Sequence, residues 1–99
     1  MDNATLSAAT YDAFRAHPRL RGADEVLERH GSPNQVVEEH SHAFDADAVV
    51  TAGEMWLTRG GSSEHLVPGD SFQLAAGTPH SERYGPQGAT YWVARRHPR

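Results

Sequence analysis

Turn signals recur at short intervals through most of this 99-residue chain, and their spacing constrains the fold more than any other feature. Clusters rich in Gly, Pro, Ser, Asn and Asp stand at 31–34, 59–62, 68–70, 77–79 and 85–88. Between the clusters, apolar and polar residues alternate, so that Met55 and Leu57, or Phe72 and Leu74, share one face of an extended chain. Turns about 8–12 residues apart with such segments between them are typical of an antiparallel sandwich or barrel.

We therefore predict an all-β domain of about eight short strands. The first surrounds Val26 and Leu27, and a mostly apolar strand breaks at Gly53. The remaining strands are expected at 35–41, 48–52, 54–58, 64–67, 71–75, 80–84 and 90–94. The organisation that follows is an N-terminal helix and loop over residues 1–23, a β-barrel over 24–94 and a basic, frayed tail over 95–99.

Residues 11–17 are predicted to form the helix ahead of the strands. Thr10 can cap it, Tyr11 and Phe14 stand at helical spacing, and Pro18 ends it. The first ten residues lack the basic and apolar parts of a signal peptide, so we expect a cytoplasmic protein.

The composition excludes several classes of function. The chain has no cysteine, which excludes a disulfide scaffold, thiol catalysis and Cys-ligated metal sites. No apolar run approaches the roughly 20 residues that a membrane span needs. Nine basic residues stand against 13 acidic ones, a net charge of −4, and this disfavours nucleic acid as a partner.

Seven histidines in 99 residues are the unusual part of the composition. His40 and His42 stand two apart in an expected strand, so both imidazoles project from one face and can converge on one metal ion. His80 follows a turn rich in Gly and Pro, which can bring it to the same end of a barrel. Such a pair by itself is more often a surface pair or a satisfied polar cluster. The other four histidines have no partner at ligand spacing, and we expect them on the surface: His17, His30, His65 and His97.

Two longer patterns resemble the motifs of the cupin superfamily. The first cupin motif, H-x-H-x3-E-x6-G, falls on His40, His42 and Gly53. The second, P-G-D followed by a P-x-G-x-P-H-like segment, falls on Pro68, Gly69, Asp70, Gly77, Pro79 and His80. The resemblance covers about residues 36–93. It implies a small single-domain cupin of the cupin-2 type, an antiparallel, jelly-roll-like β-barrel with a metal held by His40, His42 and His80.

One departure from the first motif concerns the glutamate ligand, whose position is Ala46 here. Three interpretations stay open. The metal has three histidine ligands only, or Asp45 or Asp47 supplies a carboxylate through a local bulge, or Glu82 reaches in as a ligand or general acid/base. We favour the three-histidine site with Glu82 beside it.

Tyr84 stands where the second motif of the family ends in Asn. Its hydroxyl can hydrogen-bond a bound ligand, and a buried structural tyrosine is an equal alternative. With Glu82, it completes the set of catalytic candidates.

Three imidazoles suit a divalent transition metal, and the sequence leaves Fe, Zn, Ni, Mn and Cu open. The resemblance implies a metalloenzyme of dioxygenase, isomerase or lyase type, acting on a small oxygenated or carboxylate substrate. The alternatives are a cupin that binds or senses a small molecule without turnover, and a structural barrel whose histidines only form hydrogen bonds. We also expect a homodimer, because edge strands need covering and Trp56 and Trp92 add apolar surface.

Overall fold

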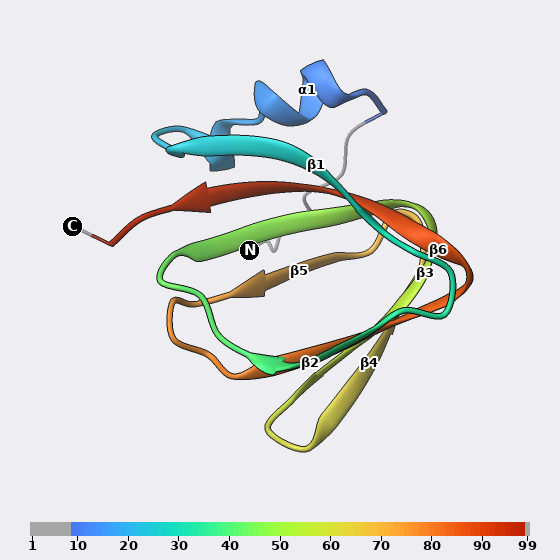
Figure 1. Cartoon of the computed structure of the whole chain (residues 1–99). Helices are drawn as coiled ribbons and strands as arrows, with labels where there is room; N and C mark the ends of the chain where they lie inside the picture. Colours follow the sequence, from blue (N-terminus) through green and yellow to red (C-terminus); the bar gives the residue numbers. More distant parts are fainter. Residues whose placement is uncertain (1–8, 99) are drawn as a thin grey trace.

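Six strands of one antiparallel sheet build the computed structural model, which describes residues 9–98 (Figure 1). They are β1 (Glu25–Gly31), β2 (Val36–His40), β3 (Asp45–Arg59), β4 (Ser62–Leu66), β5 (Ser71–Leu74) and β6 (His80–Arg96). The strand order is β1-β6-β3-β4, while β2 also pairs with β6 and β5 with β3. Each half of a long strand has its own short partner, so the sheet curls into a jelly-roll-like barrel that does not close. The predicted fold class is confirmed.

The two long strands correct the prediction of eight short ones. β3 continues through Gly53, and β6 continues through the expected turn at 85–88. Gly53 and Gly88 have φ angles of 74° and 72°, so each strand bends there without ending. A Cβ on Gly53 would lie 2.1 Å from the carbonyl oxygen of Gly88, so the two backbones approach too closely for a side chain. Pairing therefore survives the bend, with a register shift between Gly53 and Met55.

The end of β6 differs from the expected tail. Arg95 and Arg96 are its last two residues, and Arg95 pairs with both Glu25 and Ala46. The sequence predicts a basic, frayed tail from Arg95 onward, because charged residues dominate this end. Pairing on both sides holds Arg95 in the sheet, Arg96 pairs with Asp45, and alternation turns Arg95 to the same face as Tyr91 and Val93.

The predicted helix is confirmed in a shorter form as α1 (Tyr11–Arg15), followed by the 3-10 helix η1 (Pro18–Leu20). The Thr10 hydroxyl accepts a 3.1 Å hydrogen bond from the backbone N–H of Ala13, which is the expected N-cap. Within residues 9–98, no helix is long and apolar enough to cross a membrane.

Helix α1 lies over β1 and β6 and covers the outer face of the sheet there (Figure 1). Phe14 is fully buried, and its ring centroid lies 5.8 Å from that of Trp92. Trp92 is only 9% exposed as a result. The helix of the same chain hides this tryptophan, so Trp92 does not support the dimer argument.

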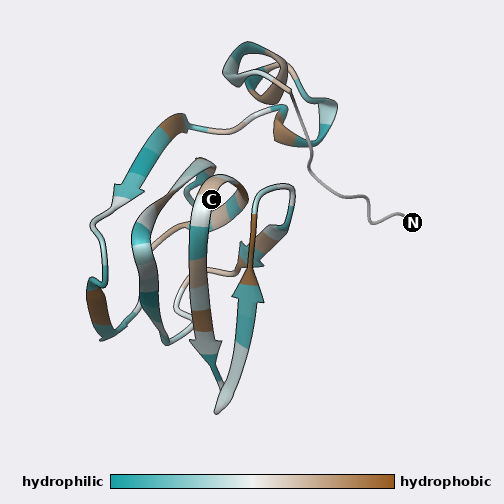
Figure 2. Cartoon of the chain, turned by 90° about the vertical axis from the view of Figure 1, so that its right-hand side faces the viewer, coloured by the Kyte–Doolittle hydropathy of each residue, from teal (hydrophilic) through white to brown (hydrophobic). Residues whose placement is uncertain are grey.

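The main core fills the inside of the barrel. Figure 2 shows short apolar segments along strands that are otherwise mostly hydrophilic, as expected for strands with one buried face. The inward side chains form one cluster: Ala46, Ala48, Val50, Met55, Leu57, Leu66, Phe72, Leu74, Tyr84, Ala89 and Val93. This apolar floor supports the polar residues at the end of the barrel where β2 and β6 begin to pair.

Candidate metal centre

The structure brings His40, His42 and His80 together at one end of the barrel. His40 ends β2 and pairs with His80, which begins β6, while His42 lies in the loop after β2. The Gly77 N–H donates a 2.8 Å hydrogen bond to the His42 carbonyl and ties that loop to the turn ahead of His80. One ring nitrogen of each histidine lies within 4.8 Å of the other two. This spacing suits three ligands of one ion.

Backbone carbonyls define the tautomers of two of these rings. His40 Nδ1 lies 2.8 Å from the Glu38 carbonyl oxygen, and His80 Nδ1 lies 2.9 Å from that of Thr78. A carbonyl oxygen only accepts, so each Nδ1 carries a proton, and in the neutral ring the lone pair is on Nε2. Metal-bound histidines are oriented in the same way, with the far nitrogen donating to a carbonyl or carboxylate.

The inward nitrogen of His80 lacks the hydrogen-bond partner that a buried polar atom normally has. His80 is 1% exposed, and its Nε2 has no hydrogen-bond partner among residues 9–98. His40 Nε2 and His42 Nε2 lie 3.2 Å apart. A buried lone pair without a donor is costly, and a cation accepts all three lone pairs at once. The residues present therefore fit a divalent metal ion.

The electrostatics of His42 favour its neutral form. Burial lowers the pKa of His42, and the neighbouring His40 and His80 lower it further. Its ring stacks on Phe44, with the centroids 4.7 Å apart. Metal binding requires neutral imidazole, so this shift prepares the ring for coordination at neutral pH.

Of the carboxylates considered from the sequence, only Glu82 lies beside the histidines. Asp45 accepts a 2.8 Å hydrogen bond from the Ala76 N–H, and Asp47 lies 3.0 Å from the Arg19 guanidinium. Strand pairing holds both on β3 away from the three rings, so the suggestion of a bulge that turns either of them inward is wrong. Within the described part of the chain, the group with ligand spacing contains the three histidines alone.

Glu82 and Tyr84 form a hydrogen-bonded pair on the cavity wall. The Tyr84 hydroxyl donates a 2.5 Å hydrogen bond to Glu82 Oε1, while Glu82 Oε2 lies 3.5 Å from His80 Nε2. Burial raises the pKa of Tyr84, and Tyr91 and Glu82 raise it further, so its hydroxyl stays protonated. The Tyr84 ring also packs against Gly31, where a Cβ would meet it at 2.3 Å, so the residue has a structural contact as well.

A cavity of about 140 Å³ adjoins this group. It is lined by Arg29, His30, Gln35, Val37, His40, His42, Glu82, Tyr84, Tyr91 and Arg95. A smaller hollow of about 40 Å³ continues inward, where the methyl group of Ala46 stands in place of the glutamate of the family motif. The site is thus polar at its mouth and apolar at its base.

Sequence reasoning missed Arg29, Tyr91 and Arg95 as lining residues. The signal was present in the alternation that puts Arg29 on the face of Leu27 and Arg95 on the face of Tyr91 and Val93. The barrel is expected to end at residue 94, so Arg95 falls in the expected tail. His30 is exposed, as expected, and lies at the cavity mouth, where its Nδ1 is 3.0 Å from the Thr90 hydroxyl.

The other histidines take structural roles. His17 caps η1 by accepting from the Arg19 N–H, and His65 lies 2.8 Å from Glu54 on the outer face of the sheet. The His65 ring also stacks on Trp56. His97 contacts Phe44 edge-on, with the centroids 5.9 Å apart.

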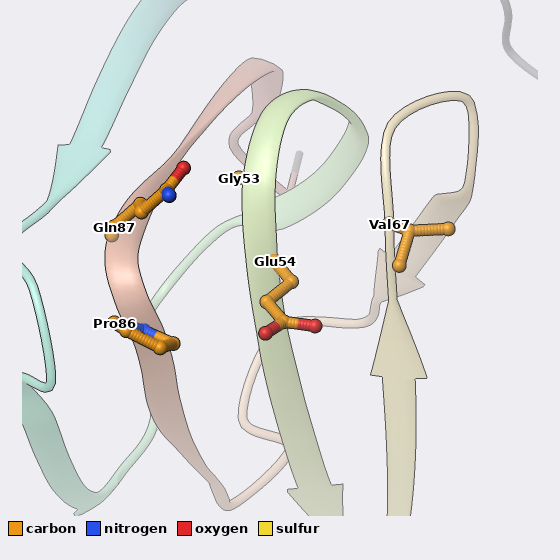
Figure 3. A pocket seen from close by; sticks show the side chains of 6 residues that line it. Gly53, Glu54, Val67, Pro86 and Gln87 are labelled. Atoms are coloured by element: carbon orange, nitrogen blue, oxygen red, sulfur yellow. The ribbon is translucent and has the colours of Figure 1, made fainter.

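A larger hollow of about 410 Å³ lies on the outer face, between β3, β4 and β6 (Figure 3). It is lined by Gly53, Glu54, Val67, Pro86, Gln87 and Gly88. Glu54 is its one ionisable lining residue, and it already pairs with His65. The larger hollow thus lacks a group of side chains that could bind a metal or transfer a proton, so the smaller cavity beside the histidines is the candidate site.

Solved structures place the chain in a fold class. No protein-family model and no curated protein matches the sequence. An RmlC-like cupin from Shewanella frigidimarina is 19% identical, with a TM-score of 0.68 over 79% of this chain and 69% of that one. The cupin-2 domain of an XRE-family regulator from Enterobacter cloacae is 20% identical, with a TM-score of 0.63 over 75% and 81%. The chain therefore has the fold of a small cupin-2 type domain, as its two motifs predicted.

Enzymes also share this fold. A structure from a study of two DMSP lyases is 19% identical, with a TM-score of 0.66. The match covers 72% of this chain but 37% of that one, so the chain corresponds to part of the larger protein.

Proposed function

We propose that this domain binds one divalent transition metal through His40, His42 and His80 and uses it to bind a small molecule. The observation that carries the proposal is the buried Nε2 of His80, which has no hydrogen-bond partner while Nδ1 is held by a carbonyl. A histidine that only fills space does not need its free lone pair aimed at two other imidazoles.

The proposed activity is that of a metal-dependent enzyme of the dioxygenase, isomerase or lyase type. Bound there, the metal supplies Lewis-acid chemistry, or oxygen activation if it is iron. Three neutral ligands leave its charge uncompensated, which favours an oxygen ligand with negative charge.

Glu82 is the proposed proton carrier at this site. Its Oε2 faces His80 and its Oε1 is held by Tyr84, so the carboxylate has a fixed orientation. Since the Tyr84 hydroxyl stays protonated, Tyr84 acts as the donor that orients Glu82 and Glu82 acts as the base. A base fixed at the cavity wall can take a proton from a molecule bound beside it.

The test is elemental analysis of the purified wild-type protein beside His42→Ala. We expect one metal per chain in the wild type and almost none in the variant. His65→Ala is the matched control, because it removes a histidine from the outer face. Absence of metal from the wild type after incubation with each of Fe, Zn, Ni, Mn and Cu would remove the proposal.

A second candidate is a small-ligand binding or sensing domain with the same metal but no turnover. Ala46 favours this candidate. A site with alanine in place of the glutamate of the family motif has one negative charge fewer and one metal ligand fewer. Oxygen consumption or product formation with candidate substrates separates the two, since a sensor binds and returns its ligand unchanged.

A further inference from the structure

Two arginines that the metal centre does not use converge on its cavity. Arg29 lies exposed at the mouth on β1, and Arg95 lies deeper on β6. Arg29 is the cross-strand partner of Tyr91, and Arg95 shares the inward face of Tyr91 four residues further on. Both arginines therefore line the cavity that His40 and His42 also line.

The guanidinium of Arg95 is fixed but only partly satisfied. It stacks over Phe44, with Cζ 4.6 Å from the ring centroid, and its Nη1 lies 3.6 Å from Oε1 of Glu25, its cross-strand partner on β1. Its Nε is buried and has no hydrogen-bond partner among the described residues. Arg95 also lines the inner hollow that His80 lines. The two buried side-chain nitrogens that lack a partner thus belong to residues of one cavity.

The charges around the cavity favour an anion. Glu82 is its one lining carboxylate, against Arg29 and Arg95. Glu25, which does not line the cavity, offsets part of the Arg95 charge, and Arg29 has no carboxylate partner within residues 9–98. A divalent ion on the histidines adds further positive charge. A bound anion balances this excess and supplies the acceptor that Arg95 Nε lacks.

We propose that Arg29 and Arg95 bind the carboxylate group of a small organic acid. One carboxylate oxygen contacts the arginines, and the second carboxylate oxygen faces the three histidines. This inference rests on the proposed function, because it names the substrate class of the same cavity. At about 140 Å³, the cavity is below the roughly 300–1,000 Å³ of pockets for drug-sized ligands, so the acid has only a few carbons. A planar monoanion matches the guanidinium fork and meets less repulsion from Glu82 than a phosphate dianion does.

The test is a titration of metal-free and zinc-loaded protein with lactate, followed by nitrogen-15 NMR. Lactamide, the neutral analogue of the same shape, and inorganic phosphate are titrated in parallel into the metal-free protein. We expect lactate to shift the Arg95 Nε–H signal saturably in both forms of the protein. Lactamide should bind at least about tenfold more weakly, the usual cost of losing one hydrogen bond to a charged group. Phosphate should also bind at least about tenfold more weakly, because its second negative charge is repelled by Glu82.

Two variants and a control decide the assignment. Arg95→Gln should weaken lactate binding at least about tenfold, and Arg29→Gln, at an exposed position, should weaken it several-fold. Arg83→Gln is the matched control, because Arg83 lies on the same strand but stacks on Trp56 at the outer face. Equal binding of lactamide or phosphate, unchanged binding in both variants, or no saturation in the wild type would overturn the inference. Metal content, measured on the same samples, reports the proposed function separately.

Discussion

Nε2 of His40 and Nε2 of His42 lie 3.2 Å apart on the wall of the cavity, while Nδ1 of His40 is held by the Glu38 carbonyl. Two lone pairs at this distance repel unless a proton or a metal ion lies between them. Protons and the metal therefore compete for the same nitrogen atoms, and this competition sets the pH dependence of the site.

Metal affinity should be highest above about pH 6.5 and should fall as the pH drops below that value. Because the pKa of His42 is lowered by burial and by its two histidine neighbours, His42 stays available to the metal below that pH. Metal content after dialysis across a pH series measures this. Full occupancy at a pH of about 4.5 would instead indicate a site dominated by carboxylates.

Glu82→Gln should keep the metal and lose proton transfer. The amide removes the base but not the three imidazoles, so we expect one metal per chain and a fall in turnover of about 10²–10⁴-fold. Metal content and turnover, measured on the same preparation, separate the two roles. If the metal is lost with the carboxylate, Glu82 is a ligand and the three-histidine assignment fails.

Ala46→Glu should raise metal affinity by at least about tenfold, because it restores a charged donor at the position that lines the inner hollow. A competition titration against a chromophoric chelator gives the affinity. Ser41→Glu is the control, since it adds the same charge on the exposed residue between His40 and His42. An equal gain in both variants would mean that the added charge acts at long range and not as a ligand.

Gly53→Ala should destabilise the fold far more than Gly60→Ala. Both glycines have positive φ angles, so each substitution costs about 1 kcal/mol in backbone strain. At Gly60 a Cβ meets nothing within 4 Å, whereas at Gly53 it would lie 2.1 Å from the Gly88 carbonyl oxygen. We expect an additional loss of about 2 kcal/mol or more at Gly53, visible in urea unfolding. Equal losses would show that the strands can separate at this point without cost.

The domain should form a homodimer in solution. Edge strands remain unpaired in the open sheet, and Val36 is 60% exposed beside Arg83, its cross-strand partner. Light scattering at micromolar concentration should give twice the chain mass, and Val36→Glu should lower the apparent mass. A monomer at that concentration would contradict the prediction.

Local patterns predicted much of the site. Most of the turn residues lie at strand ends, the Thr10 cap begins the helix, and two-residue spacing brings His40 and His42 to one centre. The Gly60–Gly61 turn follows in the same way, because both residues have the positive φ angles that a tight hairpin needs. These features depend on a few neighbouring residues, so the sequence alone contains them.

Long-range strand pairing decided the features of the fold and the site that local sequence patterns did not predict. Gly53 looks like a strand end in isolation, and only the close approach of Gly88 makes it a bend within one strand. Arg95 looks like part of a charged tail until β1 and β3 pair with it on both sides and turn it inward. The Tyr84–Glu82 hydrogen bond and the carbonyl contacts of His40 and His80 likewise depend on how the barrel folds. The sequence by itself determined which residues can bind a metal, whereas the tertiary structure decided which charges surround it, because strand pairing joins residues far apart in the chain.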